Sequence, residues 1–489
     1  MSPYTILAII AAYFGLLLTI SWFTSRKANN QSFFIGNRQS PWYIVAIGMI
    51  GASLSGVTFI SVPGWVENSQ FLYIQMVLGY LVGYAVIIYV LLPVYYKMQL
   101  TSIYSYLDER FGNISYKTGA SLFLLSRLIG ASFRLFLVAN VLQITVFNAI
   151  GVPFILTVLI TLLLIWVYTF RGGIKTIVWT DTLQTVFMLT AVVLTLLMIL
   201  KAMNLNLWEG IQLIKASEYS TMFDFSGWRS ETYFWKYFMS GAFITIVMTG
   251  LDQDMMQKNL SCRNLKDAQK NMLSYSIAFV PVNIIFLSLG ALLFIFAGQS
   301  GIAIPERLDD IFPLIAMNGY LPAIVGVFFI LGLIAAAYSS ADSALTALTT
   351  SFMVDIIGTK DHSEKAVKQQ RMLTHFLMSL VIAVIIVVFK SINDQSVISA
   401  LFKAAGFTYG PLLGLYAFGF TTKNKVEEIM VPFIAVLSPV VMFVLNLYSE
   451  KLFWGYTMGF EVLIYNGLLT YLLLLIVSKS NSVQNETLD

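Results

Sequence analysis

Three polar residues share one helical face in a long apolar stretch in the second half of the chain. Ser339, Asp342 and Ser343 are spaced i, i+3 and i+4, so their side chains point the same way if the stretch is a helix. Hydroxyl and carboxylate oxygens are the ligands that a hard cation such as sodium prefers. A lone carboxylate at mid-membrane depth is costly, so we expect Asp342 to have a cation, a proton or an arginine (Arg127 or Arg134) as its partner.

A second carboxylate, Asp181, lies about one turn inside another apolar stretch, within residues 179–184 (WTDTLQ). Two carboxylates at membrane depth repel each other unless a cation lies between them or one of them holds a proton. We therefore expect Asp181 and Asp342, together with neighbouring hydroxyl groups, to form a cation site. A position of Asp181 at the membrane interface is the alternative.

Two other apolar stretches carry helix-breaking residues at matching places in the two halves of the chain. The first contains residues 51–56 (GASLSG) and 62–64 (VPG), and the second contains residues 249–253 (TGLDQ). Glycine weakens a helix, and interior proline removes a hydrogen bond. In transporters with inverted repeats, paired interrupted helices bind solute and ions near mid-membrane. Because the two stretches stand five helices apart, we favour this interpretation over simple close packing of small residues.

The composition limits the class of protein that carries these residues. Of the 489 residues, 58% are apolar or aromatic and 11% are charged, against roughly 25% charged in a soluble domain. This excludes an ordinary soluble enzyme, a nucleic-acid-binding protein and a disordered scaffold. The single cysteine, Cys262, excludes an internal disulfide framework. We find no arrangement of a nucleophile and a base, so we do not expect an enzyme.

About 13 apolar stretches are each long enough to cross a bilayer, which takes roughly 20 apolar residues. We therefore expect an all-α membrane protein with about 13 transmembrane helices. One leading helix lies in 1–40, a ten-helix core in 41–420, and two trailing helices with a polar tail in 421–489. The stretches lie at about 4–24, 41–66, 72–96, 118–148, 152–170, 176–202, 233–257, 271–298, 319–356, 372–389, 396–420, 428–447 and 457–478.

The basic residues predict how the chain is oriented in the membrane, because they concentrate in loops on the cytoplasmic side. With the N-terminus outside and the C-terminus in the cytoplasm, most of the 29 lysines and arginines, Lys258 among them, fall in cytoplasmic loops. Arg26 and Lys27 follow the first apolar stretch and no basic residue precedes it, which is the reverse of a signal peptide. We expect a retained leading helix.

At these residues the sequence resembles the sodium/solute symporter family, whose members carry sugars, sialic acid, proline, iodide, vitamins and monocarboxylates. The resemblance covers most of the chain and implies a leucine-transporter-type fold with a 5+5 inverted repeat. It rests on 54–59 (LSGVTF), 102–111 (SIYSYLDERF), 172–173 (GG) with 178–181 (VWTD), 252–253 (DQ) with 257–258 (QK), the run 335–343 (AAAYSSADS) in a helix that ends in Asp355, and 410–414 (GPLLG).

The resemblance also implies a set of ion ligands, carried over by position. The first sodium site would use the backbone carbonyls of Gly51, Leu54 and Ala336 and the hydroxyls of Ser339 and Ser340. Some relatives have a second sodium site, and its counterparts here are Asp181, Ser340, Asp342 and Ser343. Relatives with two sodium ions typically have a hydroxyl residue in place of Asp342, so the second cation here is either sodium or a proton.

The sequence indicates the nature of the solute less directly than it indicates the ion sites. The sequence around Ser55 and Thr58 is more similar to the sialic-acid and monocarboxylate branches than to the sugar branch. Arg127 and Arg134 lie about one turn either side of an arginine that bacterial sialic-acid transporters use, although pairing with a carboxylate such as Asp342 is the alternative. Lys403 either lines the cavity or reaches the outer surface. The expected solute-binding residues are Ser55, Thr58, Gln75, Arg134, Asp252 and Gln253.

These observations together predict a symporter in a bacterial inner membrane that imports a small organic anion, such as sialic acid or a monocarboxylate, with one or two sodium ions. A sodium-coupled sugar symporter is the alternative within this class. A channel or a transporter-derived sensor is the alternative outside it. The expected partners are a small-molecule solute and the lipid bilayer, with no nucleic acid and no obligate protein partner.

Overall fold

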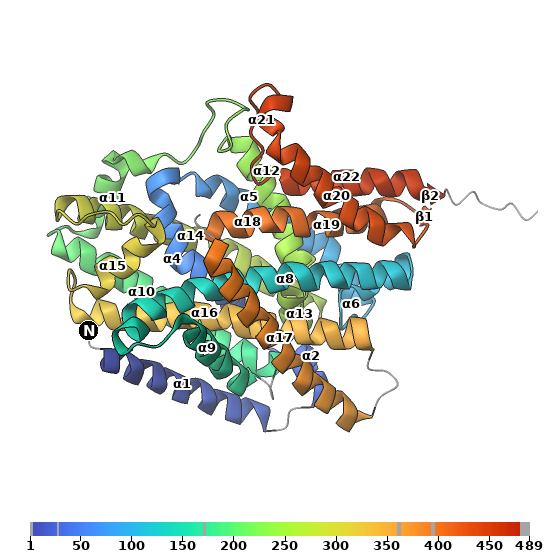
Figure 1. The fold of residues 1–489 in the computed structure, drawn as a ribbon, viewed down its shortest axis with the longest axis horizontal. Helices are drawn as coiled ribbons and strands as arrows, with labels where there is room; N and C mark the ends of the chain where they lie inside the picture. The colour runs from blue at the N-terminus through green and yellow to red at the C-terminus, as the bar shows by residue number, and fades with distance from the viewer. Residues whose placement is uncertain (1–2, 27–28, 170–172, 359–362, 393–396, 480–489) are drawn as a thin grey trace, which may run out of the picture.

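The fold is a bundle of long helices, seen in a computed structural model that describes residues 3–26, 29–169, 173–358, 363–392 and 397–479. Lys27, Gly172 of the glycine pair and the C-terminal tail from residue 480 onward lie outside the described residues. Helix α1 lies along one side of the bundle, and α20 and α22 lie along the opposite side (Figure 1). The predicted leading and trailing helices therefore flank the core.

The long helices lie within or around the predicted apolar stretches, with short 3₁₀ or π segments (η) at several of their ends, whereas the short helices α2, α7 and α11 and the strand β1 lie between stretches. The first half contains α1 (Pro3–Ser25), α2 (Asn30–Ile35), η1 (Gly36–Arg38), α3 (Trp42–Ser53), α4 (Gly56–Ser69), α5 (Tyr73–Val86), η2 (Ile87–Leu91), α6 (Leu92–Lys97), α7 (Ser105–Arg110), α8 (Asn113–Leu142), η3 (Gln143–Phe147), η4 (Asn148–Ile150), α9 (Phe154–Thr169), α10 (Ile174–Ala202), α11 (Leu207–Ala216) and η5 (Glu218–Ser220). The second half contains α12 (Phe234–Thr245), η6 (Ile246–Gly250), α13 (Gln253–Leu260), α14 (Leu265–Gln299), η7 (Leu308–Asp310), α15 (Ile311–Met317), α16 (Ala323–Ser351), η8 (Phe352–Ile357), α17 (Glu364–Ile392), α18 (Val397–Thr408), α19 (Gly410–Thr421), β1 (Lys425–Val426), α20 (Met430–Leu447), α21 (Ser449–Leu452), α22 (Val462–Val477) and β2 (Ser478–Lys479).

Eight helices within the described residues are long and apolar enough to cross a membrane, or up to ten if each of two bent pairs counts as one span. Two further apolar helices, α9 and α22, are shorter. The prediction of a helical membrane protein is confirmed. One detail differs from an all-α chain, since β1 and β2 pair antiparallel and join the start of α20 to the end of α22.

Both predicted interruptions are present. The chain bends by 53° between α3 and α4, at Leu54 and Ser55, and by 63° between η6 and α13, at Leu251 and Asp252. Pro63 lies inside α4 and does not end it. The first break therefore lies in the glycine- and serine-rich run that precedes the proline.

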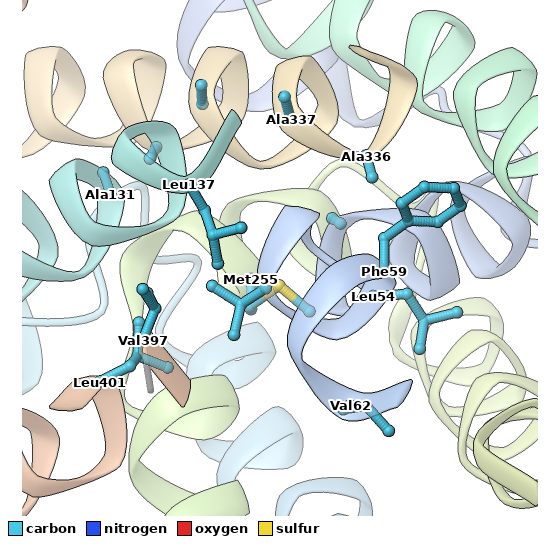
Figure 2. Close-up of a cluster of buried hydrophobic side chains, with 14 of the residues drawn as sticks. Leu54, Phe59, Val62, Ala131, Leu137, Met255, Ala336, Ala337, Val397 and Leu401 are labelled. Atoms are coloured by element: carbon cyan, nitrogen blue, oxygen red, sulfur yellow. The ribbon is translucent and has the colours of Figure 1, made fainter. Parts of the chain in front are cut away.

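Close approach of the helices explains one of the glycines at the first break. A Cβ atom at Gly51 would collide with the side chain of Thr185 on α10, so α3 needs a residue without a side chain there. Helix α16 passes on the other side, where Ala336 faces Phe59 and Leu54 (Figure 2). The first break thus lies between two long helices, α10 and α16, that carry the predicted cation ligands.

Candidate functional site

The polar face of α16 is buried and makes contact with α10. Ser339, Ser340, Asp342 and Ser343 are each at most 1% exposed. Ser339 Oγ donates a hydrogen bond to Asp181 Oδ1 at 2.7 Å, and Ser340 Oγ donates to the carbonyl of Ala336 at 2.8 Å. The structure therefore brings Asp181 to the same helix face as the serines, and Asp181 is itself fully buried in the protein.

The first break presents backbone oxygens near this face. No amide or side chain of the described residues donates a hydrogen bond to the carbonyl oxygen of Gly51 or of Leu54. A hydroxyl that donates one hydrogen bond keeps its lone pairs, so Ser339 and Ser340 remain able to ligate a cation. These carbonyl and hydroxyl oxygens have the chemistry that a sodium ion requires.

The carboxylates of the predicted second site are held by different partners. Asp342 Oδ2 accepts a hydrogen bond from the hydroxyl of Tyr168 on α9 at 2.7 Å, whereas its Oδ1 is buried with no hydrogen-bond partner among the described residues. Asp181 lies close enough to Asp342 for the two charges to repel. Ser343 Oγ donates to the carbonyl of Ser339 at 2.8 Å and contacts Asp254 Oδ2 at 3.4 Å. An unpaired buried oxygen beside a second carboxylate fits a cation or a proton.

Lys258 is the main functional residue that the sequence analysis missed. We predicted it to lie in a cytoplasmic loop, and this is wrong, because it lies on α13 with 1% of its surface exposed. Its Nζ is 2.8 Å from Asp181 Oδ2 and 3.9 Å from Asp254 Oδ1. A signal was present in the sequence, since Asp254 and Lys258 are spaced i, i+4 directly after the second break.

The second break is surrounded by a cluster of charged side chains that form ion pairs with one another. Asp252 caps α13 by accepting hydrogen bonds from the next amides, and it also accepts one from Tyr409 Oη at 2.6 Å. Arg127 on α8 forms ion pairs with Asp254 and, at 3.6 Å, with Asp252. The alternative pairing of Arg127 or Arg134 with Asp342 is therefore absent among the described residues.

A cavity of about 90 Å³ lies beside the first break. The hydroxyl residues Ser55 and Thr58 line it from α4, and Arg127 and Arg134 line it from α8. Arg134 has no carboxylate within 4 Å among the described residues, and its Nε is buried without a hydrogen-bond partner. Four tyrosines, joined in hydrogen-bonded pairs, form another wall: Tyr73 with Tyr80, and Tyr84 with Tyr275.

Three of the predicted solute-binding residues do not line this cavity. Both ends of the Gln75 amide are bonded to the segment between α11 and α12, through Asp224 N and Thr232 O, each at 3.0 Å. Gln253 is bonded in the same manner to the backbone of residues 101 and 103. Asp252 is held by its cap and by the charged cluster, and Lys403 is exposed on α18.

The chain is similar in sequence and in fold to known proteins. The sodium/sialic acid symporter SiaT of Proteus mirabilis is 24% identical over 462 residues, covering 88% of this chain and 88% of its own. The sodium/sialic acid symporter NanT of Aliivibrio fischeri is 25% identical over 429 residues, covering 83% and 81%. A solved Na⁺-coupled sialic acid symporter, in a substrate-bound outward-open state, has a similar fold with a TM-score of 0.81 at 20% identity, over 97% of this chain and 99% of that chain.

These relatives are transporters and not enzymes, as predicted. The model of the family described as "SSF: Sodium:solute symporter family" matches residues 33–423, which is well over half of the chain. The chain therefore belongs to the sodium:solute symporter family.

Proposed function

We propose that this protein is a sodium-coupled symporter that imports a small organic anion, such as a monocarboxylate or sialic acid, by alternating access. The observation that carries the proposal is Arg134, a cationic side chain that lines the cavity without a carboxylate partner among the described residues. An unpaired charge in a buried site is unfavourable, so an anionic solute would complete it.

The start of α4 supports the same solute class. The helix begins at Gly56, and Arg134 lies beside it, because a Cβ at Gly56 would be 3.8 Å from the Arg134 carbonyl. The first amides of a helix are unpaired and carry a partial positive charge, which favours a bound carboxylate. The hydroxyls of Ser55 and Thr58 have no hydrogen-bond partner among the described residues, so they are available to the solute.

The first sodium ion would be bound by the carbonyls and hydroxyls that meet between the first break and α16. Its ligands are the carbonyls of Gly51, Leu54 and Ala336 and the hydroxyls of Ser339 and Ser340. The free carbonyls of Gly51 and Leu54 are the observation that supports this site. The first break lines the cavity. A sodium ion bound at the break would therefore favour the conformation in which the cavity holds an anion.

A second cation would bind at Asp181, Ser340, Asp342 and Ser343. The energy balance favours a second ion for an anionic solute. One sodium ion gains about 2.3 kcal/mol from a 100 mV potential, and an entering monoanion loses the same amount. A tenfold sodium gradient then leaves only about 1.4 kcal/mol, or tenfold accumulation. A second sodium ion raises the limit to several thousand-fold, on the order of 5 kcal/mol.

For the arrangement in the membrane, we infer about 13 spans with a 5+5 inverted repeat, the N-terminus outside and the C-terminus in the cytoplasm of a bacterial cell. The two breaks, five helices apart, support the repeat. A fluorescent reporter that matures only in the cytoplasm tests the orientation. It should fluoresce when fused to the C-terminus and stay dark at the N-terminus, and the opposite result would overturn the assignment of loop sides.

A binding screen with purified protein tests the solute class. Sialic acids, monocarboxylates, sugars and amino acids are each titrated with sodium and with choline in its place. We expect binding of an organic anion in sodium only, and its loss in Arg134→Gln. Sodium-dependent sugar binding that survives this substitution would replace the anion proposal with the sugar alternative. Conductance without any solute would indicate a channel.

A further inference from the structure

The charged side chains around the two breaks do not cancel. Four carboxyl groups stand against three cationic groups, so one negative charge remains if all are ionised. The carboxyl groups are Asp181, Asp252, Asp254 and Asp342, and the cationic groups are Arg127, Arg134 and Lys258. Asp342 on α16 is the carboxyl group without an ion-pair partner among the described residues, and its hydrogen-bond partner is a tyrosine.

Lys258 occupies the oxygen that a second cation would use. Its Nζ lies 2.8 Å from Asp181 Oδ2, whereas the other oxygen, Oδ1, is bonded to Ser339. A buried ammonium at this distance neutralises the carboxylate, so a mobile cation must compete with it for Asp181. We propose that Lys258 is the resident cation of the second site, and that a mobile cation binds Asp181 only by displacing it. This inference rests on the second cation site proposed above.

The structure also contains a place for the displaced ammonium. Asp254 Oδ1 is 3.9 Å from Lys258 Nζ, on the same helix and one turn away. A short change in the lysine side chain would exchange one carboxylate for the other, so the buried charge would never be left without a partner.

Displacement of Lys258 would affect the solute cavity through Asp254. The other oxygen of Asp254 is paired with Arg127, which lines the cavity. When the ammonium group moves to Asp254, the attraction between Asp254 and Arg127 weakens. The positive charge of Arg127 then becomes available to an anion in the cavity. A cation at Asp181 and an anion in the cavity therefore favour each other, and by linkage the effect is reciprocal. Lys258 acts as a positioning residue between the two sites.

Sodium binding without solute tests the proposal. Full-length protein in detergent is titrated with radioactive sodium at constant ionic strength, with choline as the replacement cation. In the wild type we expect a strong component and a weak component. In Lys258→Gln the weak component should tighten by at least about tenfold, because the competing charge is gone. In Lys258→Arg it should weaken, because guanidinium pairs more tightly with a carboxylate. Asp181→Asn and the Lys258→Gln, Asp181→Asn double variant should lose it.

Each outcome is informative. Competition is also supported if the wild type shows one sodium-binding component and Lys258→Gln shows two. Sodium-binding curves that are the same in the wild type and in Lys258→Gln would overturn the proposal. Loss of the weak component in Lys258→Gln would also overturn it, because Lys258 would then help to build the site. If Lys258→Gln does not fold, the arginine variant decides, since equal or tighter binding there contradicts competition. A wild type that binds no sodium at all contradicts the proposed function, whereas strong binding with an unaffected weak component contradicts this inference alone.

Discussion

The two broken helices of this transporter differ in how their polar groups are satisfied. At the first break the groups are uncharged, and several have no partner in the described structure: the carbonyls of Gly51 and Leu54 and the hydroxyl of Ser55. At the second break the groups are charged, and Asp252 and Asp254 are held by protein partners. Unpaired groups invite mobile ligands, whereas paired ones hold a structure together.

We infer from this difference that the two breaks have different tasks. In the proposed function, the oxygens of the first break bind an ion and its amides bind an anion. At the second break the charged groups have protein partners, and these ion pairs connect α13 to α8 and α10. Substitutions at the first should remove binding and spare folding, whereas loss of an ion-pair partner at the second, as in Arg127→Gln, should mainly lower stability.

The largest effect is expected for the ion ligands opposite the first break. Replacing Ser339 and Ser340 together by alanine removes two of the five proposed ligands of the first sodium ion. Since loss of even indirect ligand support weakens metal sites about 10- to 100-fold, we expect at least about 100-fold weaker sodium dependence of uptake. Uptake in proteoliposomes measures it. Thr349→Ala, at another buried hydroxyl of α16, serves as the control.

A double variant that kept the sodium dependence of the wild type would contradict this first site. Size-exclusion chromatography shows whether the protein is folded. Ser339 also contacts Asp181, so the single variants separate its two contributions. Ser340→Ala alone should affect the first ion more than the second.

The arginines of α8 provide a sharper comparison, because they lie two turns apart on one helix. Arg127→Gln leaves Asp252 and Asp254 without their cation, and loss of one partner of a buried ion pair costs about 3–5 kcal/mol. Arg134→Gln breaks no ion pair among the described residues, so its stability should change by less than about 1 kcal/mol while anion binding is lost. Thermal unfolding in detergent measures the first effect and solute titration the second.

The double variant Arg127→Gln with Asp254→Asn controls for the charge. It should recover part of the stability, because the unpaired carboxylate is removed together with its partner. If Arg134→Gln were as destabilising as Arg127→Gln, the distinction between a paired and an unpaired arginine would be wrong.

The next effect concerns the second cation. Asp342→Asn removes a carboxylate that has no cation partner among the described residues, and it leaves the proposed ligands of the first ion intact. We expect the sodium dependence of uptake to change from sigmoidal to hyperbolic with little change in stability. Asp342→Ser keeps an oxygen ligand of the kind found in two-sodium relatives and should remain sigmoidal. A curve for Asp342→Asn as steep as the wild type would contradict the participation of this carboxylate.

Local features could be predicted well from the sequence. The breaks at Leu54 and at Asp252 follow from glycine, serine and cap-forming residues within a few positions, and the polar face of α16 follows from helical spacing alone. Family membership followed from motifs whose order is visible in the chain. These properties depend on neighbours in sequence, and the structure confirms the breaks and the shared face.

Partners distant in sequence could not be predicted. Lys258 pairs with Asp181 across 77 positions, and Arg127 pairs with carboxylates of α13 instead of Asp342, because the packing of helices decides which charges meet. The amide of Gln75 is likewise occupied by a segment about 150 residues later. The polar residues within apolar stretches predict a buried polar site. Only the fold determines which of these groups remain unpaired and available to ligands.

The smallest effect is expected in α4 beyond the first break, where the uncharged region meets a buried carboxyl group. Asp309 of η7 packs beside Gly64 and is 5% exposed, and this burial raises the pKa of Asp309 to about 6 from an ordinary value of 3.8. The folded protein therefore holds this proton more tightly than the unfolded chain does. Stability is highest when Asp309 is protonated, falls as pH rises from about 4 to about 6, and is level above that range.

Asp309→Asn is neutral at every pH and should remove this loss. A shift of two pKa units corresponds to at most about 3 kcal/mol, so the variant should unfold at a higher temperature than the wild type at pH 7.5 and at nearly the same temperature at pH 4. Glu306→Gln, an exposed acid in the same segment, should show no such pH-dependent difference. A lower unfolding temperature for Asp309→Asn at pH 7.5 would mean that the ionised carboxylate makes a stabilising contact with α4. The part of α4 around Gly64 would then resemble the charged second break more than the uncharged region beside it.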